Sequence, residues 1–122
     1  MALHKLVVIS LDSMGFRDLD EFREFVPHLD QLIKRGTWVK RVRGIFPTLT
    51  YPSHTSIITG QYPAIHGIVN NTKIQPQRES PDWYWYRKDV KAMPLYDVAR
   101  EAGLTTAAFL WPVTAGSKIN YN

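Results

Sequence analysis

Short apolar runs alternate with amphipathic segments along this chain. Residues 5–11 form a near-continuous apolar run, which is typical of a strand that is buried on both faces of a sheet. Residues 37–43, in which Trp38 and Val39 are expected to pack, and residues 104–110 predict two further strands.

Amphipathic helices are predicted between these strands. One begins at Pro27 and ends at Gly36, and its apolar residues share a face: Leu29, Leu32 and Ile33. Another begins at Pro94 and ends at Gly103, with apolar residues recurring at i, i+3, i+4 and i+7: Leu95, Val98, Ala99 and Ala102. Strands that alternate with helices predict an α/β fold with a mostly parallel sheet and helices on both of its faces.

Hydroxyl side chains gather where an extended segment turns into a further, short helix. From residue 46 the chain reads Phe-Pro-Thr-Leu-Thr-Tyr-Pro-Ser-His-Thr-Ser-Ile-Ile-Thr-Gly, so Pro52 lies just inside the helix start and Gly60 just past its end. The first backbone N–H groups of such a helix are expected to point outward and to favour anions. A hydroxyl held beside them is a candidate nucleophile for phosphoryl transfer.

Two further motifs accompany this block. Asp12 follows the first apolar run directly, and residues 66–71 read His-Gly-Ile-Val-Asn-Asn. This combination resembles the type I phosphodiesterase/nucleotide pyrophosphatase family of the alkaline phosphatase superfamily, over a stretch that extends to Phe-Leu-Trp-Pro at residues 109–112. The resemblance implies an alkaline-phosphatase-like α/β fold. Residues 1–122 would form the N-terminal part of one catalytic domain, so that the sheet would be incomplete.

The resemblance implies roles for three residues. Thr50 matches the family nucleophile, whose oxygen attacks phosphorus and forms a covalent phospho-threonine that water then hydrolyses. Asp12 matches an aspartate that binds the metal near the nucleophile, and direct coordination of Thr50 to that cation would remove its proton. Asn71 matches an asparagine whose amide donates to a phosphoryl oxygen. Two divalent metal ions are implied, with zinc favoured over manganese.

Each of these polar residues also has a structural interpretation. Asp12 would end a strand and cap a turn, although Ser13 stands where many relatives have glycine. Asn71 would be a turn asparagine, next to the similar Asn70. His54 is either a general base or, as we favour, a histidine that packs against the strand. Three other residues are expected to brace the turn or hold the following loop: Thr48, Ser53 and His66.

Composition narrows the class of protein. The chain has 122 residues, of which 44% are hydrophobic, and it contains no cysteine, which excludes disulfides, thiolate metal sites and a cysteine nucleophile. No apolar stretch reaches the ~20 residues of a membrane helix. The first apolar run is too short for the core of a signal peptide, so we expect a cytoplasmic protein with no membrane span.

Basic residues cluster within a segment that contains no acid: Lys34, Arg35, Lys40, Arg41 and Arg43. Contact with nucleic acid and steering of an anionic substrate are two interpretations. We favour a solvated strand edge protected by charge, because no aromatic residues of the kind that stack on bases lie within the run. Specific nucleic-acid binding is therefore not expected.

Aromatic residues crowd the irregular segment 73–93. Trp83 and Trp85 could form a wall for a base or another flat substrate group. We favour the interpretation that these aromatics pin a long loop to the body of the protein.

The predicted metal ligands are too few. Two hydrolytic metals need about six protein ligands when each is bound by about three, yet no histidine follows His66 and only Glu101 is acidic after Asp97. We therefore expect a fragment that is inactive alone and that self-associates through its uncovered sheet. The alternatives are a catalytically silent α/β chain that binds an anion or a single metal, and a phosphomonoesterase or phosphonate hydrolase of the same superfamily.

Overall fold

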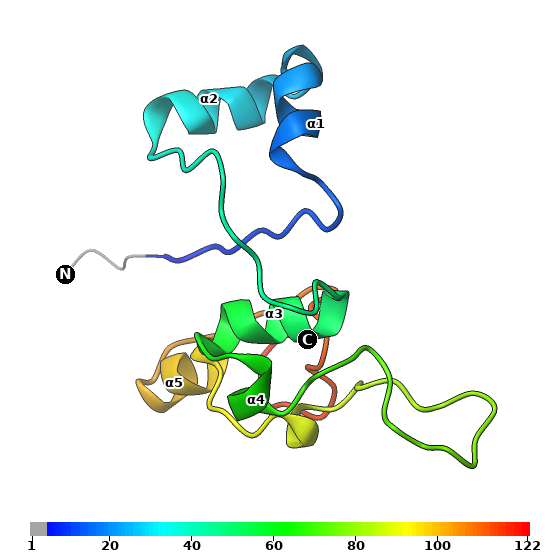
Figure 1. Cartoon of the computed structure of the whole chain (residues 1–122). Helices are drawn as coiled ribbons and strands as arrows, with labels where there is room; N and C mark the ends of the chain where they lie inside the picture. Colours follow the sequence, from blue (N-terminus) through cyan, green and yellow to red (C-terminus); the bar gives the residue numbers. More distant parts are fainter. Residues whose placement is uncertain (1–4) are drawn as a thin grey trace. The chain divides into compact units, whose positions relative to one another are not determined.

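The computed structural model describes residues 5–122. The chain divides after Arg43 into two compact units, Met1–Arg43 and Gly44–Asn122 (Figure 1). Each unit has its own helices and its own contacts, and each is described by itself below.

The first unit contains α1 (Phe16–Glu21), the short 3₁₀ helix η1 (Arg23–Phe25) and α2 (Pro27–Arg35). The predicted helix after Pro27 is confirmed, and it ends where the N–H of Gly36 donates to the Leu32 carbonyl at 2.9 Å. Asp30 forms ion pairs with Arg23 and Lys34. Hydrogen bonds from Lys34 and Arg23 lower the pKa of the Asp30 carboxyl.

The three predicted strands are not present as strands in residues 5–122. Residues 5–11 and 37–43 carry no ladder pairing, and residues 104–110 contribute a single parallel bridge, Ala107 to Tyr121. The other bridges are Thr72–Trp83, antiparallel, and Tyr86–Ala115, parallel. A strand depends on a neighbour for its backbone hydrogen bonds and on packing for its apolar side chains. Without such a neighbour, the first run stays exposed, with Ile9 74% accessible.

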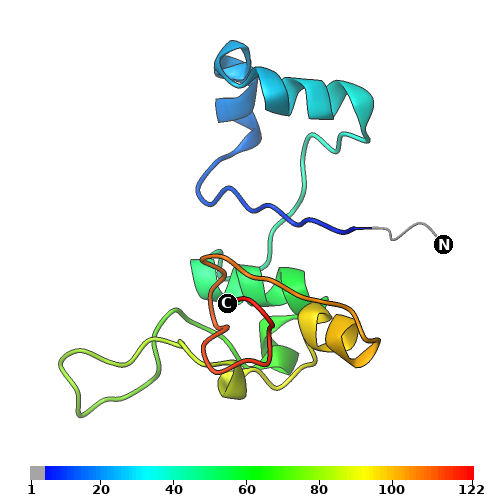
Figure 2. The ribbon, with the colours of Figure 1, turned by 180° about the vertical axis from the view of Figure 1, so that it is seen from behind.

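The second unit contains α3 (Thr50–Thr59), α4 (Pro63–His66), the 3₁₀ helix η2 (Arg87–Asp89) and α5 (Leu95–Glu101). The predicted helices after residue 49 and after Pro94 are both confirmed. Gly60 adopts φ 64° at the end of α3, a left-handed conformation that glycine accepts without a steric penalty. The last residues fold back toward the segment that leaves α5, through the bridge at Ala107 (Figure 2).

The core of the second unit surrounds the second residue of α3. Tyr51 is 8% exposed and belongs to one cluster with Ile68, Val90 and Val113, against which Tyr84 packs. These residues come from well-separated parts of the chain. The start of α3 is therefore anchored from several directions.

A buried histidine links α3 to α4. His66 is fully buried, and its Nδ1 accepts the N–H of Ile68 at 3.1 Å. The proton must then sit on Nε2, which donates to the Ser56 hydroxyl at 2.9 Å. His66 thus holds the loop that follows it, in the position that the sequence predicts. Burial lowers the pKa of the His66 imidazole, against a smaller opposing effect of the hydrogen bond that the ring donates to the backbone carbonyl of Pro52.

The folded state should therefore lose stability in mild acid. Because the pKa of His66 lies below its unfolded value of about 6.5, the unfolded chain binds more protons than the folded one as the pH falls below that value. We expect the free energy of unfolding to decrease between pH 7 and pH 5 in urea titrations. His66→Ala should be less stable by about 2 kcal/mol at pH 7.5, since it strands the N–H of Ile68. It should also lack this part of the pH dependence, and an unchanged pH profile in His66→Ala would contradict the assignment.

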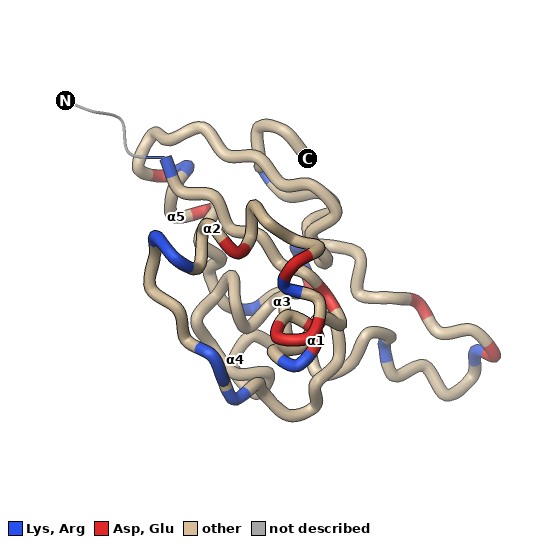
Figure 3. The backbone as a smooth tube through the Cα atoms, turned by 90° about the horizontal axis from the view of Figure 1, so that it is seen from above, with Lys and Arg blue, Asp and Glu red and all other residues tan. Residues whose placement is uncertain are grey.

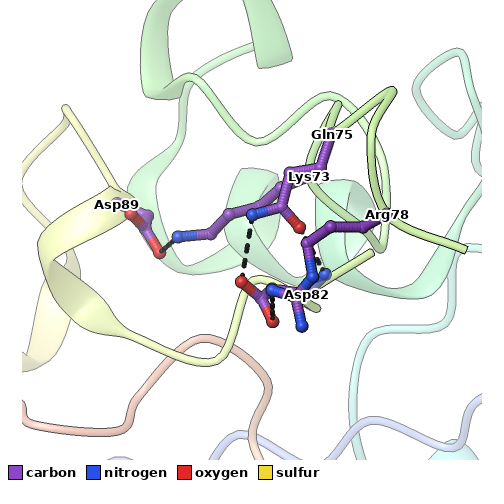
Figure 4. Close-up of polar contacts among 5 residues, drawn as sticks. All are labelled: Lys73, Gln75, Arg78, Asp82 and Asp89. Atoms are coloured by element: carbon purple, nitrogen blue, oxygen red, sulfur yellow. Dashed lines mark hydrogen bonds and ion pairs between the residues drawn. The ribbon is translucent and has the colours of Figure 1, made fainter. Parts of the chain in front are cut away.

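The segment between Thr72 and Trp83 projects from the second unit as a long loop (Figures 1 and 2). Figure 4 shows how polar contacts close it: the Asp82 carboxylate accepts from Gln75 Nε2 at 3.0 Å and pairs with Arg78 at 2.6 Å. At its base, Lys73 pairs with Asp89 at 2.9 Å, which raises the pKa of the Lys73 ammonium group. Along this loop the basic residues, Lys73 and Arg78, precede the acidic residues, Glu79 and Asp82 (Figure 3).

The two tryptophans of the loop pack on the body of the unit. Trp83 and Trp85 stack on each other with ring centroids 5.8 Å apart. Both also meet the Tyr51 ring edge-on, at 5.3 and 6.1 Å. The predicted pinning of the loop is confirmed, and it fastens the loop to the residue that follows Thr50.

The basic run of the first unit does not form the expected strand edge. Lys40 pairs with Asp20 at 2.6 Å, and the Arg41 guanidinium lies over the Phe16 ring at 4.8 Å. Both cations therefore contact side chains of α1. Residues 37–43 form no strand whose edge their charges could protect from pairing.

Apolar side chains are widely exposed elsewhere as well, for example Phe109 at 84%. Such exposure is unusual for a stable monomer, and self-association of the 122-residue chain stays a prediction. None of the helices within residues 5–122 combines the length and the apolar character that crossing a membrane requires.

Candidate active site

Thr50 is the first residue of α3, at the point where the chain changes from extended to helical. The preceding Leu49 is extended, with φ −101° and ψ 154°, and its carbonyl accepts the N–H of Ser53 at 3.0 Å. Thr50 itself is partly buried. The predicted nucleophile therefore stands at the start of a regular element that is anchored in the core through the next residue.

Asn71 reaches the start of α3. Its Oδ1 accepts the N–H of Tyr51 at 2.9 Å. An acceptor for an N–H must be the amide oxygen, so this contact fixes which end of the amide is which and leaves both Nδ2 hydrogens for another acceptor. The backbone of Asn71 is also held, because its carbonyl accepts the N–H of Tyr84 at 3.0 Å.

Asn70 is placed differently from its neighbour. Its side chain accepts the N–H of Asn71 at 2.8 Å, and the residue is exposed. Of the two asparagines, Asn71 is the one whose amide lies beside the Thr50–Tyr51 peptide.

His54 lies one turn after Thr50 and is 7% exposed. Its Nδ1 lies 2.8 Å from the Thr50 carbonyl oxygen, which can only accept, so Nδ1 carries the proton and donates. The imidazole meets the Trp111 ring edge-on, with centroids 5.1 Å apart and an interplanar angle of 79°. His54 is therefore packed, as favoured from the sequence, with a tryptophan rather than a strand as its partner.

The helix terminus offers fewer backbone donors than the sequence predicts. The N–H of Tyr51 is taken by Asn71, Pro52 has no N–H, and the N–H of Ser53 closes the first turn. The expectation of outward N–H groups is therefore wrong for these three positions. The side chain of Asn71 stands beside them, with its amide oxygen toward the helix.

Asp12 lies in the first unit, in a turn that follows residues 5–11. Its Oδ1 accepts the N–H of Ser13 at 3.0 Å, and the N–H of Met14 donates to the Leu11 carbonyl at 3.3 Å. Ser13 has φ 63°, a left-handed conformation that glycine adopts more readily than serine. Ser13 therefore forms this turn at some cost in backbone strain.

The predicted metal ligands are oxygen atoms. Carboxylate and hydroxyl oxygens such as those of Asp12 and Thr50 suit zinc, manganese or magnesium. Within residues 5–122, however, no group of three or more histidine, aspartate or glutamate side chains has the arrangement of a metal site. This part of the chain can supply only part of a two-metal ligand set.

Residues 6–122 match the family described as type I phosphodiesterase / nucleotide pyrophosphatase. The chain belongs to this family. Membership places it in the α/β class of the alkaline-phosphatase-like folds, although the parallel sheet is not seen in the described residues.

Several curated proteins are similar to this type I phosphodiesterase family member. Human ectonucleotide pyrophosphatase/phosphodiesterase family member 1 is 32% identical over an alignment of 127 positions that covers 95% of this chain. Bovine bis(5′-adenosyl)-triphosphatase ENPP4 is 36% identical over an alignment of 119 positions that covers 90% of this chain. The venom phosphodiesterase of Macrovipera lebetinus is 27% identical over an alignment of 128 positions that covers 96% of this chain. The chain spans only 13%, 25% and 14% of the lengths of these relatives, respectively.

Proposed function

We propose that residues 1–122 form the N-terminal part of the catalytic domain of a metal-dependent hydrolase that cleaves phosphodiester or pyrophosphate bonds. The observation that carries this proposal is the hydrogen bond from the N–H of Tyr51, the residue after Thr50 at the start of α3, to the amide oxygen of Asn71. Family membership supports hydrolysis of these bonds as the reaction class.

In the proposed reaction, Thr50 Oγ1 forms a bond to phosphorus while the bond from phosphorus to the leaving oxygen breaks. Water then attacks the same phosphorus, the bond to Oγ1 breaks, and the hydroxyl is restored. Two easier displacements replace one difficult displacement, which is the advantage of a covalent intermediate. The Asn71 Nδ2–H donors would stabilise the negative charge that develops on a non-bridging oxygen.

Asp12 and Thr50 are proposed as ligands for the two divalent cations that the family resemblance implies, zinc or manganese. Such a cation, when bound, supplies the positive charge that favours the alkoxide form of a coordinated hydroxyl. The described residues contain no cluster of three or more ligands that would complete such a site.

The substrate is proposed to be a small phosphate ester. The relatives' names describe pyrophosphatases, phosphodiesterases and a bis(5′-adenosyl)-triphosphatase. These names favour phosphodiesters and phosphoanhydrides over phosphomonoesters or phosphonates, which remain the alternatives within the superfamily. The predicted cytoplasmic location and the absence of specific nucleic-acid binding stay predictions.

A second candidate is a catalytically silent chain that binds an anion or a single metal. The lack of a three-ligand cluster within the described residues favours it for the 122-residue chain taken alone. In the complete catalytic domain, the first proposal applies.

One experiment separates the two candidates. The complete domain and the 122-residue chain are each assayed with an aryl phosphodiester, with and without added zinc or manganese, and with an aryl phosphomonoester as the control substrate. We expect metal-dependent hydrolysis of the diester by the complete domain alone. A complete domain that cleaves only the monoester, or neither substrate, would contradict the proposed reaction. Metal analysis of the 122-residue chain should find fewer than two tightly bound ions per molecule.

A further inference from the structure

We propose that His54 is a positioning residue for Thr50: with Asn71, it fixes the peptide group that joins Thr50 to Tyr51. This inference rests on the proposed function of Thr50 as the nucleophile. It assigns His54 neither a proton-transfer role nor a metal.

The contacts act on the two ends of one peptide plane. The carbonyl oxygen of Thr50 accepts the His54 Nδ1–H at 2.8 Å, and the amide N–H of Tyr51 donates to Asn71 Oδ1 at 2.9 Å. The C=O and the N–H belong to the same planar group, so holding both ends prevents that plane from rotating. The Cα of Thr50 is itself an atom of that plane, so holding the plane also fixes the point from which the Thr50 side chain extends.

Position in the helix makes this support necessary. Thr50 is the first residue of α3, so no earlier helical turn holds it, and helix ends fray. A nucleophile needs its attacking atom in a near-attack geometry, and a displacement of 1 Å is estimated to cost about 100-fold in rate. The side chains of His54 and Asn71, which hold the first peptide group of the helix, limit such a displacement.

His54 is itself well held. It is 7% exposed, and its ring is packed edge-on against Trp111. The carbonyl of Trp111 accepts the hydroxyl of Thr114 at 2.9 Å, a contact that closes the turn after Trp111. The donor that reaches Thr50 therefore has little freedom to swing away.

The same geometry separates positioning from general base catalysis. The Nδ1–H of His54 donates to the backbone carbonyl of Thr50 and so orients the peptide group. This contact joins His54 to the main chain of Thr50 rather than to its hydroxyl. A positioning role predicts that removing the imidazole lowers kcat without changing the shape of its pH profile. A general base predicts that the acid limb of the profile disappears.

The test uses the complete catalytic domain and an aryl phosphodiester. His54→Phe keeps an aromatic ring against Trp111 but removes the Nδ1–H donor, whereas His54→Asn keeps an N–H donor at the equivalent atom. We expect His54→Phe to lower kcat by about 10- to 100-fold with little change in KM, and His54→Asn to recover most of that loss. His28→Phe, at an exposed position of α2, is the matched control and should keep the wild-type kcat.

A second readout does not depend on activity or on metal. Hydrogen exchange at the Tyr51 amide should become at least severalfold faster in His54→Phe than in the wild type, because the peptide plane is released. Three results would each overturn the proposal. His54→Phe could have a kcat within twofold of the wild type, it could lose only the acid limb of the pH profile of kcat, or His54→Asn could fail to recover the lost activity. A wild-type domain without diester hydrolysis would instead refute the proposed function, while accelerated exchange at Tyr51 would still support the clamp.

Discussion

Thr50→Ala in the complete catalytic domain is expected to lose phosphodiester hydrolysis almost entirely, by about 10⁴-fold or more in kcat, the scale seen when a covalent nucleophile is removed. Alanine has no oxygen to attack phosphorus, so the covalent intermediate cannot form. Substrate binding should change much less, because the methyl group of alanine leaves the start of α3 and the contacts of the Thr50–Tyr51 peptide in place. Steady-state kinetics with a chromogenic diester measures both quantities.

Two variants sharpen this prediction. Thr50→Ser keeps the hydroxyl and should retain part of the activity, with phosphoserine replacing phosphothreonine when the reaction is quenched in acid. Thr59→Ala is the matched control, since its hydroxyl bonds to the Thr55 carbonyl in the last turn of α3, at the opposite end of the helix. If Thr50→Ala turned over substrate at the wild-type rate, Thr50 would have no part in the chemistry.

Helices were predictable from the sequence because they form locally. Pro27 with Gly36, and Pro94 with Gly103, bracket amphipathic segments that are helical in the structure. The strands were not predictable in this way. The apolar run at residues 5–11 has the composition of a buried strand, but pairing depends on a neighbour that local composition does not provide. The described residues hold only isolated bridges.

The candidate site shows a similar division. The threonine at the helix start and the later asparagine were found from local motifs and their resemblance to a family. The hydrogen bond from Tyr51 to Asn71 and the contact of Trp111 with His54 join segments far apart in the chain, so no local pattern reveals them. The contact of His54 with Thr50 did carry a signal, because residues four apart in a helix lie on the same face.

The core explains why the site is ordered at all. Tyr51 is the residue after the candidate nucleophile, and it is buried against Ile68, Val90 and Val113. Burial raises the pKa of its phenol, as expected for a side chain used for packing. The site is therefore built directly on the most buried part of the second unit, where rigid support for a catalytic group is available.

Asn71→Asp is the most discriminating substitution at the site. A carboxylate can still accept the N–H of Tyr51, as the amide oxygen does at 2.9 Å, so the fold should keep nearly its wild-type stability. The two Nδ2–H donors are replaced by an acceptor that carries negative charge, which repels the charge developing on the phosphoryl oxygens. Removal of one oxyanion donor alone costs about 10²–10³ in kcat, and we expect at least this loss.

Asn71→Ala should show the complementary pattern. It removes the acceptor as well, leaves the N–H of Tyr51 without its partner, and should lower the free energy of unfolding by about 1–3 kcal/mol. Kinetics and urea denaturation together therefore separate the two functions of one side chain. Asn70→Asp is the matched control, because a carboxylate there still accepts the N–H of Asn71. Aspartate suits a turn as well as asparagine does. If Asn71 only shaped a turn, Asn71→Asp would keep wild-type kcat, whereas a donor to the phosphoryl group cannot be replaced by an acid.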